Sequence, residues 1–230
     1  MSKKVIYNNF TLNVPERYFH DNLTDRFKKN IYEKEETLLC KKYFNKKDKV
    51  LELGSCLGYI SCILSKNVNS IISVEANPEL KECLIQTKKD NNLNNVQFIN
   101  AYIDKEYKVI NFQTYDNIVA GSGDREDLEI NNTRGWGNTL RYYKINTIRL
   151  EDIENINLIN SLVIDIEGGE LLFLINYKNY IIKNIKKICI ELHGHLMKDN
   201  NFDNKCIKLL ISMGFNMVDR IGISYYFEKK

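Results

Sequence analysis

The sequence lacks any run of about 18 apolar residues, the length that a membrane-spanning helix requires. Residues 1–9, MSKKVIYNN, also lack the apolar stretch of a signal peptide. We therefore expect a soluble, cytoplasmic protein with no membrane partner. No internal repeat or low-complexity linker divides the 230 residues, and their 43% hydrophobic content can fill one core. A single domain over residues 1–230 is the expectation.

Paired cysteines and an excess of basic charge are missing as well. The six cysteines contain no Cys-x-x-Cys pair, and most lie within apolar segments, so we expect reduced, buried side chains. The 33 basic and 30 acidic residues are mixed along the chain and leave a net charge of +3. Such a balance provides no basic footprint for a polyanion, and we expect no nucleic-acid partner.

A glycine turn is the most informative feature that is present. The apolar run Val50–Leu53 ends in Gly54-Ser55-Cys56-Leu57-Gly58, and a second apolar run ends at Glu75. A Rossmann-like half-site brings helix amides and a carboxylate to one nucleotide cofactor in this way. The glycine pair alone also fits an ordinary strand-to-helix turn, an interpretation that the correctly spaced acid at Glu75 disfavours.

The spacing of the glycines distinguishes between cofactors. A dinucleotide-binding turn has three glycines, Gly-x-Gly-x-x-Gly, whereas Gly54 and Gly58 stand four residues apart behind the acid Glu52. This spacing favours a ligand without phosphates, since binding the phosphates of ATP or NAD would require more backbone amides or a lysine. S-adenosylmethionine fits, because its ribose hydroxyls suit Glu75 and its positively charged methionine end tolerates Glu52.

From Lys49 onward, strand and helix patterns alternate, as they do in a parallel sheet. Phe215–Val218 and Ser224–Phe227 flank Asp219–Gly222 and predict a final hairpin with one antiparallel strand. The expected fold is α/β, a Rossmann-like class I methyltransferase fold with a mostly parallel seven-stranded sheet and a terminal antiparallel hairpin. The other predicted elements are strands at 49–53, 70–75, 96–99, 161–166 and 186–192, and helices at 58–66, 78–91, 169–183 and 203–213.

Two regions lie outside this alternation. Residues 1–48 form a lead-in with a strand pattern at Val5–Val14 and a helix at Glu33–Phe44. The apolar face of that helix would contain Leu38, Leu39, Tyr43 and Phe44. Residues 104–149 form an insertion, whose glycine-rich segment 121–139 lies between extended patterns. We predict a β-ribbon or flap built from Tyr107–Phe112, Tyr115–Ala120 and Tyr142–Leu150.

Polar residues follow two neighbouring strands, at the point where each strand ends. One tip reads Asp165-Ile166-Glu167-Gly168-Gly169-Glu170, and the other reads Glu191-Leu192-His193-Gly194-His195. Ligands of open α/β sheets bind at the carboxyl edge, so we expect these tips to face the same crevice as Gly54 and Glu75. Glu167 and Glu170 also suit the start of the following helix, a purely structural role.

Over roughly residues 45–195, these motifs together resemble the FkbM-type methyltransferases. The resemblance rests on the glycine turn, on Val74–Pro78, on Asn100–Ile103 and on the two strand tips. It implies a class I enzyme that transfers a methyl group from S-adenosylmethionine to hydroxyls of sugars or polyketide-like acceptors. It also implies that Glu52, Gly54, Ser55, Gly58 and Tyr59 hold the methionine part, Glu75 the ribose, Ala76, Asn77, Asn100 and Ala101 the adenine side, and Asp165 the edge nearest the methyl.

Transfer to a hydroxyl needs a base that removes the acceptor proton. His193 is the candidate, with an ordinary pKa of about 6.5, and Asp165 or Glu167 would orient it or serve instead. A structural histidine at a strand end is the alternative. A second mechanism, which the sequence permits but does not predict, uses Asp165, Glu191 and His193 to bind a divalent cation. The resembling enzymes often have a lysine where this chain has Val163, so any role of that lysine is absent or moved.

The insertion is the expected acceptor-binding region. Arg125, Arg134 and Arg141 would hold hydroxyls or an anionic group, and Trp136 would stack on a sugar ring or, alternatively, pack the flap onto the sheet. We therefore predict an S-adenosylmethionine-dependent O-methyltransferase that acts on a sugar or glycan hydroxyl. Another small acceptor and a non-catalytic Rossmann-like binding module are the alternatives. The sequence has no Asn-Pro-Pro-Tyr tetrapeptide of the kind found in enzymes that methylate base amines.

Overall fold

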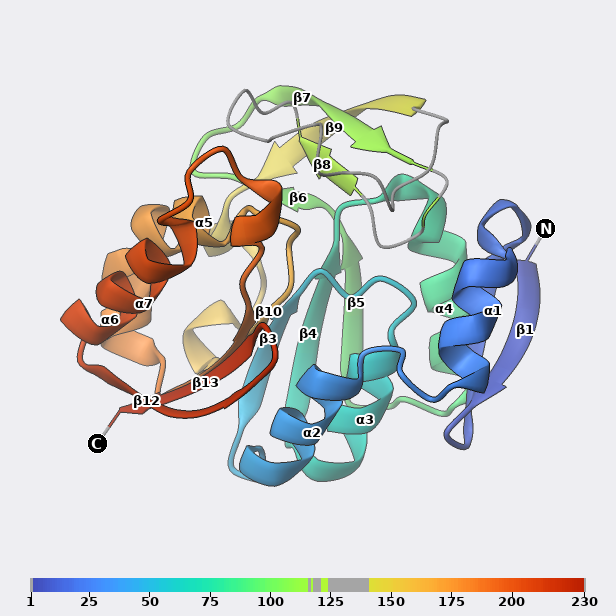
Figure 1. Cartoon of the computed structure of the whole chain (residues 1–230), viewed down its shortest axis with the longest axis horizontal. Helices are drawn as coiled ribbons and strands as arrows, with labels where there is room; N and C mark the ends of the chain where they lie inside the picture. The colour runs from blue at the N-terminus through green and yellow to red at the C-terminus, as the bar shows by residue number, and fades with distance from the viewer. Residues whose placement is uncertain (1, 116, 118–120, 124–140, 230) are drawn as a thin grey trace.

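The apolar segments predicted as strands pair into one central sheet, in the order β12-β13-β11-β10-β3-β4-β5 (Figure 1). The computed structural model describes residues 2–115, 117, 121–123 and 141–229. Neighbouring strands from β11 to β5 are parallel, whereas β13 is antiparallel to both β11 and β12. The predicted α/β fold with a terminal hairpin is thereby confirmed. The strands are β3 (Lys49–Leu53), β4 (Ser70–Glu75), β5 (Val96–Asn100), β10 (Ser161–Ile164), β11 (Lys187–Glu191), β12 (Phe215–Ile221) and β13 (Ser224–Lys229).

Alternate residues of the central strands pack into two hydrophobic clusters, one on each face of the sheet. In β3, Leu51 and Leu53 join the cluster that α5, α6 and α7 cover. Val50 points the other way, into the cluster that α2, α3 and α4 cover (Figure 1). Glu52 shares that second face with Val50, which decides its role below. The helices are α2 (Lys34–Tyr43), α3 (Tyr59–Asn67), α4 (Lys81–Asp90), α5 (Glu170–Asn176), α6 (Lys178–Asn184) and α7 (Phe202–Ser212).

The lead-in contains more elements than the sequence indicated. Its strand pattern is a hairpin of β1 (Ser2–Tyr7) and β2 (Phe10–Pro15), because Asn8 and Asn9 adopt positive φ angles of 47° and 67°. A 3₁₀ turn (Glu16–Tyr18) and α1 (Asp21–Lys28) follow. The expectation for Leu38 was wrong, since it is 46% exposed. It lies two residues after the buried Glu36, which places it on the opposite side of α2.

Three other boundaries differ from the predictions. The helix expected at 169–183 is two helices, because Tyr177 leaves the helical conformation (φ −109°, ψ 19°) and donates a hydrogen bond to the carbonyl of Asp104. The helix expected at 78–91 starts as a 3₁₀ turn (Pro78–Leu80) before α4. The final turn lies at residues 222–223, and most of the expected turn belongs to β12.

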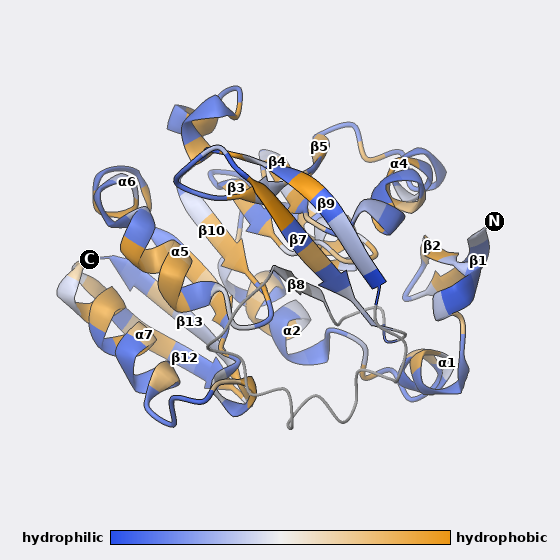
Figure 2. Cartoon of the chain, turned by 90° about the horizontal axis from the view of Figure 1, so that it is seen from above, coloured by the Kyte–Doolittle hydropathy of each residue, from blue (hydrophilic) through white to orange (hydrophobic). Residues whose placement is uncertain are grey.

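A second, smaller sheet covers the carboxyl ends of the central strands (Figure 2). It has the order β6-β9-β7-β8, and the insertion predicted as a β-ribbon contributes most of it. Of the extended stretch expected at 115–120, the structure describes only residues 115 and 117, while Gly121–Gly123 forms a strand where a loop was expected. The strands are β6 (Tyr102–Ile103), β7 (Val109–Thr114), β8 (Gly121–Gly123) and β9 (Arg141–Ile148).

All six cysteines are free, and five of them are buried, as expected for small hydrophobic side chains. Short 3₁₀ turns at Leu150–Asp152, Ile156–Leu158 and Gly194–Leu196 connect the larger elements. Within the described residues, none of the helices combines the length and the apolar character that crossing a membrane would need.

Candidate functional site

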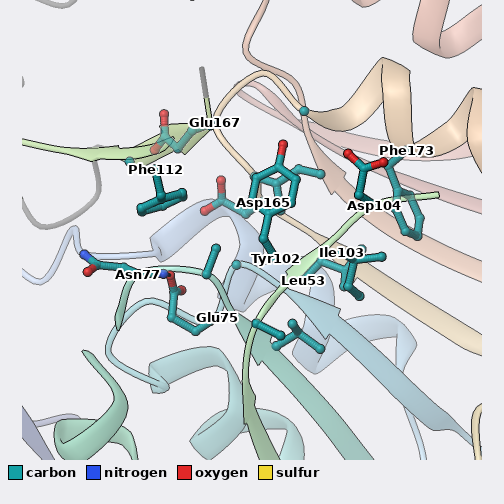
Figure 3. A pocket seen from close by; sticks show the side chains of 18 of the residues that line it. Leu53, Glu75, Asn77, Tyr102, Ile103, Asp104, Phe112, Asp165, Glu167 and Phe173 are labelled. Atoms are coloured by element: carbon teal, nitrogen blue, oxygen red, sulfur yellow. Dashed lines mark hydrogen bonds between the residues drawn. The ribbon is translucent and has the colours of Figure 1, made fainter. Parts of the chain in front are cut away.

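One cavity lies at the carboxyl edge of β3, β4 and β10, beneath the smaller sheet (Figure 3). Figure 3 shows Glu75 and Asn77 on one side of it and Asp165 and Glu167 on another. The segment with Gly54 and Glu75 and the acidic strand tip with Asp165 and Glu167 therefore line the same cavity, as the sequence predicted. The lining also includes Glu33, Leu53, Gly54, Cys56, Ala76, Ala101, Tyr102, Ile103, Asp104, Phe112, Gly121, Gly123, Ile166, Leu172, Phe173 and Tyr177.

The glycine turn is fixed by backbone contacts with both neighbouring strands. The amide of Gly54 donates to the carbonyl of Val74 at 2.9 Å, and the amide of Asp165 donates to the carbonyl of Leu53 at 2.9 Å. Gly54 has a φ of 85°, and a Cβ atom there would lie 1.7 Å from the carbonyl oxygen of Asp165. A side chain is therefore excluded at this position by both the backbone conformation and the lack of space.

Glu75 ends β4 and is held by two backbone amides. Its Oε2 accepts from the amide of Cys56 at 2.7 Å, and its Oε1 accepts from the amide of Asn77 at 2.7 Å. Burial raises the pKa of Glu75 to about 7. The carboxylate is thus oriented by both adjoining loops, and each oxygen keeps a lone pair for further donors such as the hydroxyls of a ribose.

The side expected to hold adenine is built by side chains with two different tasks. Ala76, Asn77 and Ala101 line the cavity. Asn100 instead stands behind the loop, where its amide nitrogen donates to the carbonyls of Glu75 at 2.8 Å and Asn77 at 3.0 Å. Asn100 therefore shapes this part of the site without being part of its surface.

Four residues expected to contact the methionine part do not line the cavity: Glu52, Ser55, Gly58 and Tyr59. Glu52 faces α3, where the hydroxyl of Ser61 donates to it. The ring of Tyr59 packs against Tyr7, with centroids 4.7 Å apart, inside an aromatic cluster. Gly58 has a φ of 77° at the start of α3. These residues support the glycine turn from behind, since the face of β3 that bears Glu52 is covered by helices.

His193 lies behind the acidic edge of the cavity and is surrounded by carboxylates. Its Nε2 atom is 3.5 Å from Glu191 Oε1, 3.6 Å from Asp165 Oδ1 and 3.7 Å from Glu167 Oε2. Its Nδ1 atom is 2.9 Å from Glu170 Oε1. The residue is 3% exposed and does not line the cavity. Asp165 and Glu167 present the acidic edge to a ligand.

Glu170 and Glu167, both considered as residues that start α5, have different surroundings. Glu170 is fully buried, and its Oε1 accepts from the amide of Gly168 at 3.0 Å. Glu167 lines the cavity and has a left-handed backbone with a φ of 50°. The helix-start interpretation therefore describes Glu170, whereas the Glu167 side chain is directed to the site.

The ionisable groups at this acidic edge, Asp165, Glu167 and His193, have pKa values shifted from their ordinary ranges. Burial raises the pKa of Asp165 well above its usual range, and the charge of Glu191 raises it further. Burial also raises the pKa of Glu167 to about 7, although His193 opposes this shift. For His193 itself, burial lowers the pKa, but the charges of Glu167 and Glu170 outweigh it and raise the value well above 6.5. The imidazole therefore holds its proton more tightly than a free histidine does, and Asp165 and Glu167 hold theirs more tightly than free carboxylic acids do.

Strained backbone is concentrated at this cavity. Among the described non-glycine residues with positive φ, five are asparagines, which tolerate this conformation. The remaining three, Glu33, Cys56 and Glu167, all line the cavity. Such strain is commonly found at functional sites. Sequence reasoning missed Glu33, which it placed at the start of a covering helix, and no local motif distinguishes this acid from its neighbours Glu35 and Glu36.

Of the four residues proposed to bind the acceptor, the structure describes only Arg141, which does not line the cavity. Arg125, Arg134 and Trp136 lie outside the described residues. Arg141 begins β9, is half exposed, and has its Nη1 3.8 Å from Glu79 Oε1. The smaller sheet, α5 and the residue that follows α5 contribute different side chains to the wall: Tyr102, Ile103, Phe112, Leu172, Phe173 and Tyr177.

Among the residues that the structure describes, two sets of side chains have ligand atoms close enough together to bind a cation. Asp165, Glu167 and His193 form one set, and Glu33, Glu36 and Asp165 form the other, with all atoms of a set within 4.8 Å of one another. The sequence-based alternative had Glu191 in place of Glu167.

Comparisons with known proteins agree with this geometry. The family model described as the methyltransferase FkbM domain matches residues 52–217. No protein of curated function matches the sequence. Solved structures with a similar fold include M. jannaschii TYW2 in complex with AdoMet (12% identity, TM-score 0.52, covering 100% of this chain and 87% of that one). A putative transferase from Pyrococcus horikoshii (8%, 0.53, 98% and 69%) and Trm5b from Pyrococcus abyssi (13%, 0.51, 98% and 54%) are also similar.

At these identities the likeness to solved structures shows the Rossmann-like fold alone, and the chain spans only about half the length of Trm5b. The family match is stronger evidence than the likeness to solved structures, because it covers most of the chain. It runs from Glu52 in β3 to Met217 in β12 and includes the glycine turn, Glu75 and both acidic strand tips. The chain therefore belongs to the FkbM methyltransferase family and is an S-adenosylmethionine-dependent methyltransferase.

Proposed function

We propose that the protein transfers the methyl group of S-adenosylmethionine to a hydroxyl group of a sugar or glycan. The observation that carries this proposal is the presence of three carboxylates, of Glu33, Asp165 and Glu167, in the wall of the cavity that also contains Glu75. A hydroxyl must lose its proton at or before attack on the methyl group, and a carboxylate in the cavity is a suitable base.

The proposed cofactor position follows from the two sides of the cavity. Glu75 accepts the ribose hydroxyls, and Ala76, Asn77 and Ala101 surround the adenine. The methionine part then extends along the glycine turn toward Asp165, where negative charge is favourable for the sulfonium and the ammonium. The methyl group would face the space beneath Tyr102 and Phe112.

The chemical step breaks the sulfur–methyl bond and forms an oxygen–methyl bond, so that S-adenosylhomocysteine leaves as a neutral thioether. The hydroxyl proton passes to a carboxylate of the cavity wall. Burial raises the pKa of both Glu33 and Glu167 to about 7, which makes each a stronger base than an ordinary carboxylate. His193 is buried behind Asp165 and Glu167 and does not line the cavity, so we assign it a positioning role in place of the base role that the sequence suggested.

The residues that line the cavity favour a small neutral acceptor and disfavour a nucleic acid. Its described lining residues include no lysine or arginine, whereas a phosphate backbone would need several. Tyr102, Phe112 and Phe173 provide aromatic surface, which suits the face of a sugar ring. Carboxylates and aromatic rings together are typical of sites that bind uncharged polyhydroxyl compounds.

The test is to incubate the chain with S-adenosylmethionine that carries a labelled methyl group and with a panel of free sugars and glycosides, with unmodified tRNA as the competing acceptor. We expect label on a sugar hydroxyl and none on RNA. Asp165→Asn should reduce turnover by about 100-fold or more while S-adenosylhomocysteine still binds. Label on RNA bases, with no sugar or other hydroxyl compound modified, would overturn the proposal.

A further inference from the structure

The acidic edge of the cavity gathers an unusual number of carboxylates around one imidazole. Glu33, Glu36 and Asp165 are within 4.8 Å of one another, and Glu167 and Glu191 lie on the other side of Asp165, around His193. The charge of Arg26 reaches Glu33, Glu167 and Glu191, but a single arginine does not balance five acids, of which Glu36 is buried and the other four are half-buried. Buried carboxylates of this density are usually paired or bind a metal ion.

The distances within this group fit a shared ligand better than direct hydrogen bonds. The oxygens of Asp165 and Glu167 are 3.6 and 3.7 Å from His193 Nε2, which is too long for a hydrogen bond. Asp165 Oδ1 is buried and has no hydrogen-bond partner in the described chain. Two ligands of one divalent cation, each at about 2.1 Å from it, are separated by about 3 Å, so only a small approach is needed.

The second nitrogen of His193 supplies an independent observation. Its Nδ1 lies 2.9 Å from Glu170 Oε1, and Glu170 is in turn held by the amide of Gly168. A carboxylate that accepts from one imidazole nitrogen orients the ring, and the other nitrogen binds a metal through its lone pair once the metal has displaced its proton. Here that other nitrogen, Nε2, belongs to a side chain that is almost fully buried, and it faces Asp165 and Glu167 as well as Glu191, which is nearest at 3.5 Å.

We propose that Asp165, Glu167 and His193 bind one divalent cation. The two carboxylates suit Mn²⁺ or Mg²⁺, and the imidazole favours Mn²⁺, a transition metal, over Mg²⁺, which prefers oxygen ligands. The role of the cation rests on the methyl transfer proposed above: it would hold the acceptor oxygen and lower the pKa of that hydroxyl. The proton would pass to Glu33, a carboxylate of the wall outside this ligand set and close to Asp165, as the oxygen–methyl bond forms and the sulfur–methyl bond breaks.

The test is a titration of the chelator-treated full chain with Mn²⁺, followed by electron paramagnetic resonance. The signal of free Mn²⁺ decreases as the ion binds to the protein. We expect one Mn²⁺ per chain, displaced by Mg²⁺. His193→Gln should weaken Mn²⁺ binding by at least about 10-fold while S-adenosylhomocysteine binds unchanged, because His193 does not line the cavity. Asp104→Asn is the matched control: Asp104 also lines the cavity, but it is paired with Lys108 at 2.8 Å, so Mn²⁺ affinity should not change.

The outcomes separate this inference from the proposed function. Absence of Mn²⁺ binding, or equal binding by His193→Gln, overturns the cation site even where hydroxyl methylation is observed. Stoichiometric Mn²⁺ binding that His193→Gln abolishes supports the site, including the case in which no hydroxyl acceptor is methylated and the proposed function fails. Where both hold, removal of the cation should lower turnover at least about 10-fold, and Mn²⁺ should restore it.

Discussion

Gly54 and Asp165 approach each other so closely that a Cβ atom on Gly54 would lie 1.7 Å from the carbonyl oxygen of Asp165. This contact joins the turn after β3 to the acidic tip of β10, two segments more than a hundred residues apart in the sequence. The glycine turn and the acidic edge are therefore in direct contact at the carboxyl end of the sheet.

The first prediction follows from this contact. Gly54→Ala should lower the free energy of unfolding by more than about 4 kcal/mol, because the methyl group forces the two strand tips apart. Gly214→Ala is the control, since Gly214 has a similar φ of 89° but open space around its Cβ position, and it should cost about 1–2 kcal/mol. Urea unfolding measures both; equal losses would show that backbone conformation alone, and not the contact with Asp165, requires glycine.

A second prediction concerns the pH dependence of turnover. The base must be ionised to accept the hydroxyl proton, and burial raises the pKa of Glu33, a wall carboxylate outside the proposed cation ligands, to about 7. The value of kcat/KM should therefore increase as pH rises through about 7 and level off above it. A rate profile that is already flat from pH 5 to about 8 would contradict an acid with a raised pKa as the proton acceptor.

A third prediction concerns stability. Burial raises the pKa of Glu52 from 4.5 to about 7, so the folded protein holds this proton more tightly than the unfolded chain does. The stabilisation is present below pH 4.5 and is lost as pH rises through about 7, by up to about 3 kcal/mol. Glu52→Gln removes the titration, and its unfolding free energy should fall less between about pH 5 and pH 8. Parallel pH dependence of the two proteins would disprove this assignment.

A fourth prediction separates contact from support. The hydroxyl of Tyr59 accepts a hydrogen bond from the side-chain amide of Asn8 at 2.8 Å and does not line the cavity. Tyr59→Phe should therefore leave the affinity for S-adenosylhomocysteine within about twofold, with a loss of stability of about 1 kcal/mol. A tenfold loss of affinity without loss of stability would show that Tyr59 contacts the ligand and would contradict this prediction.

The sequence predicted the fold well because the signals are local. Alternating apolar runs place β3, β4, β10 and β11 to within two residues, and Gly54 and Glu75 lie where the spacing indicated. It predicted less where a role depends on which face of an element is covered. Glu52 and Tyr59 lie in the right motif but face helices, and Glu33 reaches the cavity only because α2 packs beside the sheet. The exchange of Glu191 for Glu167 in the cation group likewise depends on a left-handed backbone that no spacing reveals.

Calorimetric titration with S-adenosylhomocysteine, NAD and ATP, repeated on Glu75→Ala, tests the cofactor site directly. Glu75 is fixed by two amides and should accept the ribose, so S-adenosylhomocysteine alone should bind, and Glu75→Ala should weaken it between about 10- and 100-fold. Binding of NAD or ATP in place of S-adenosylhomocysteine, or unchanged affinity in Glu75→Ala, would contradict the assignment of this cavity to S-adenosylmethionine.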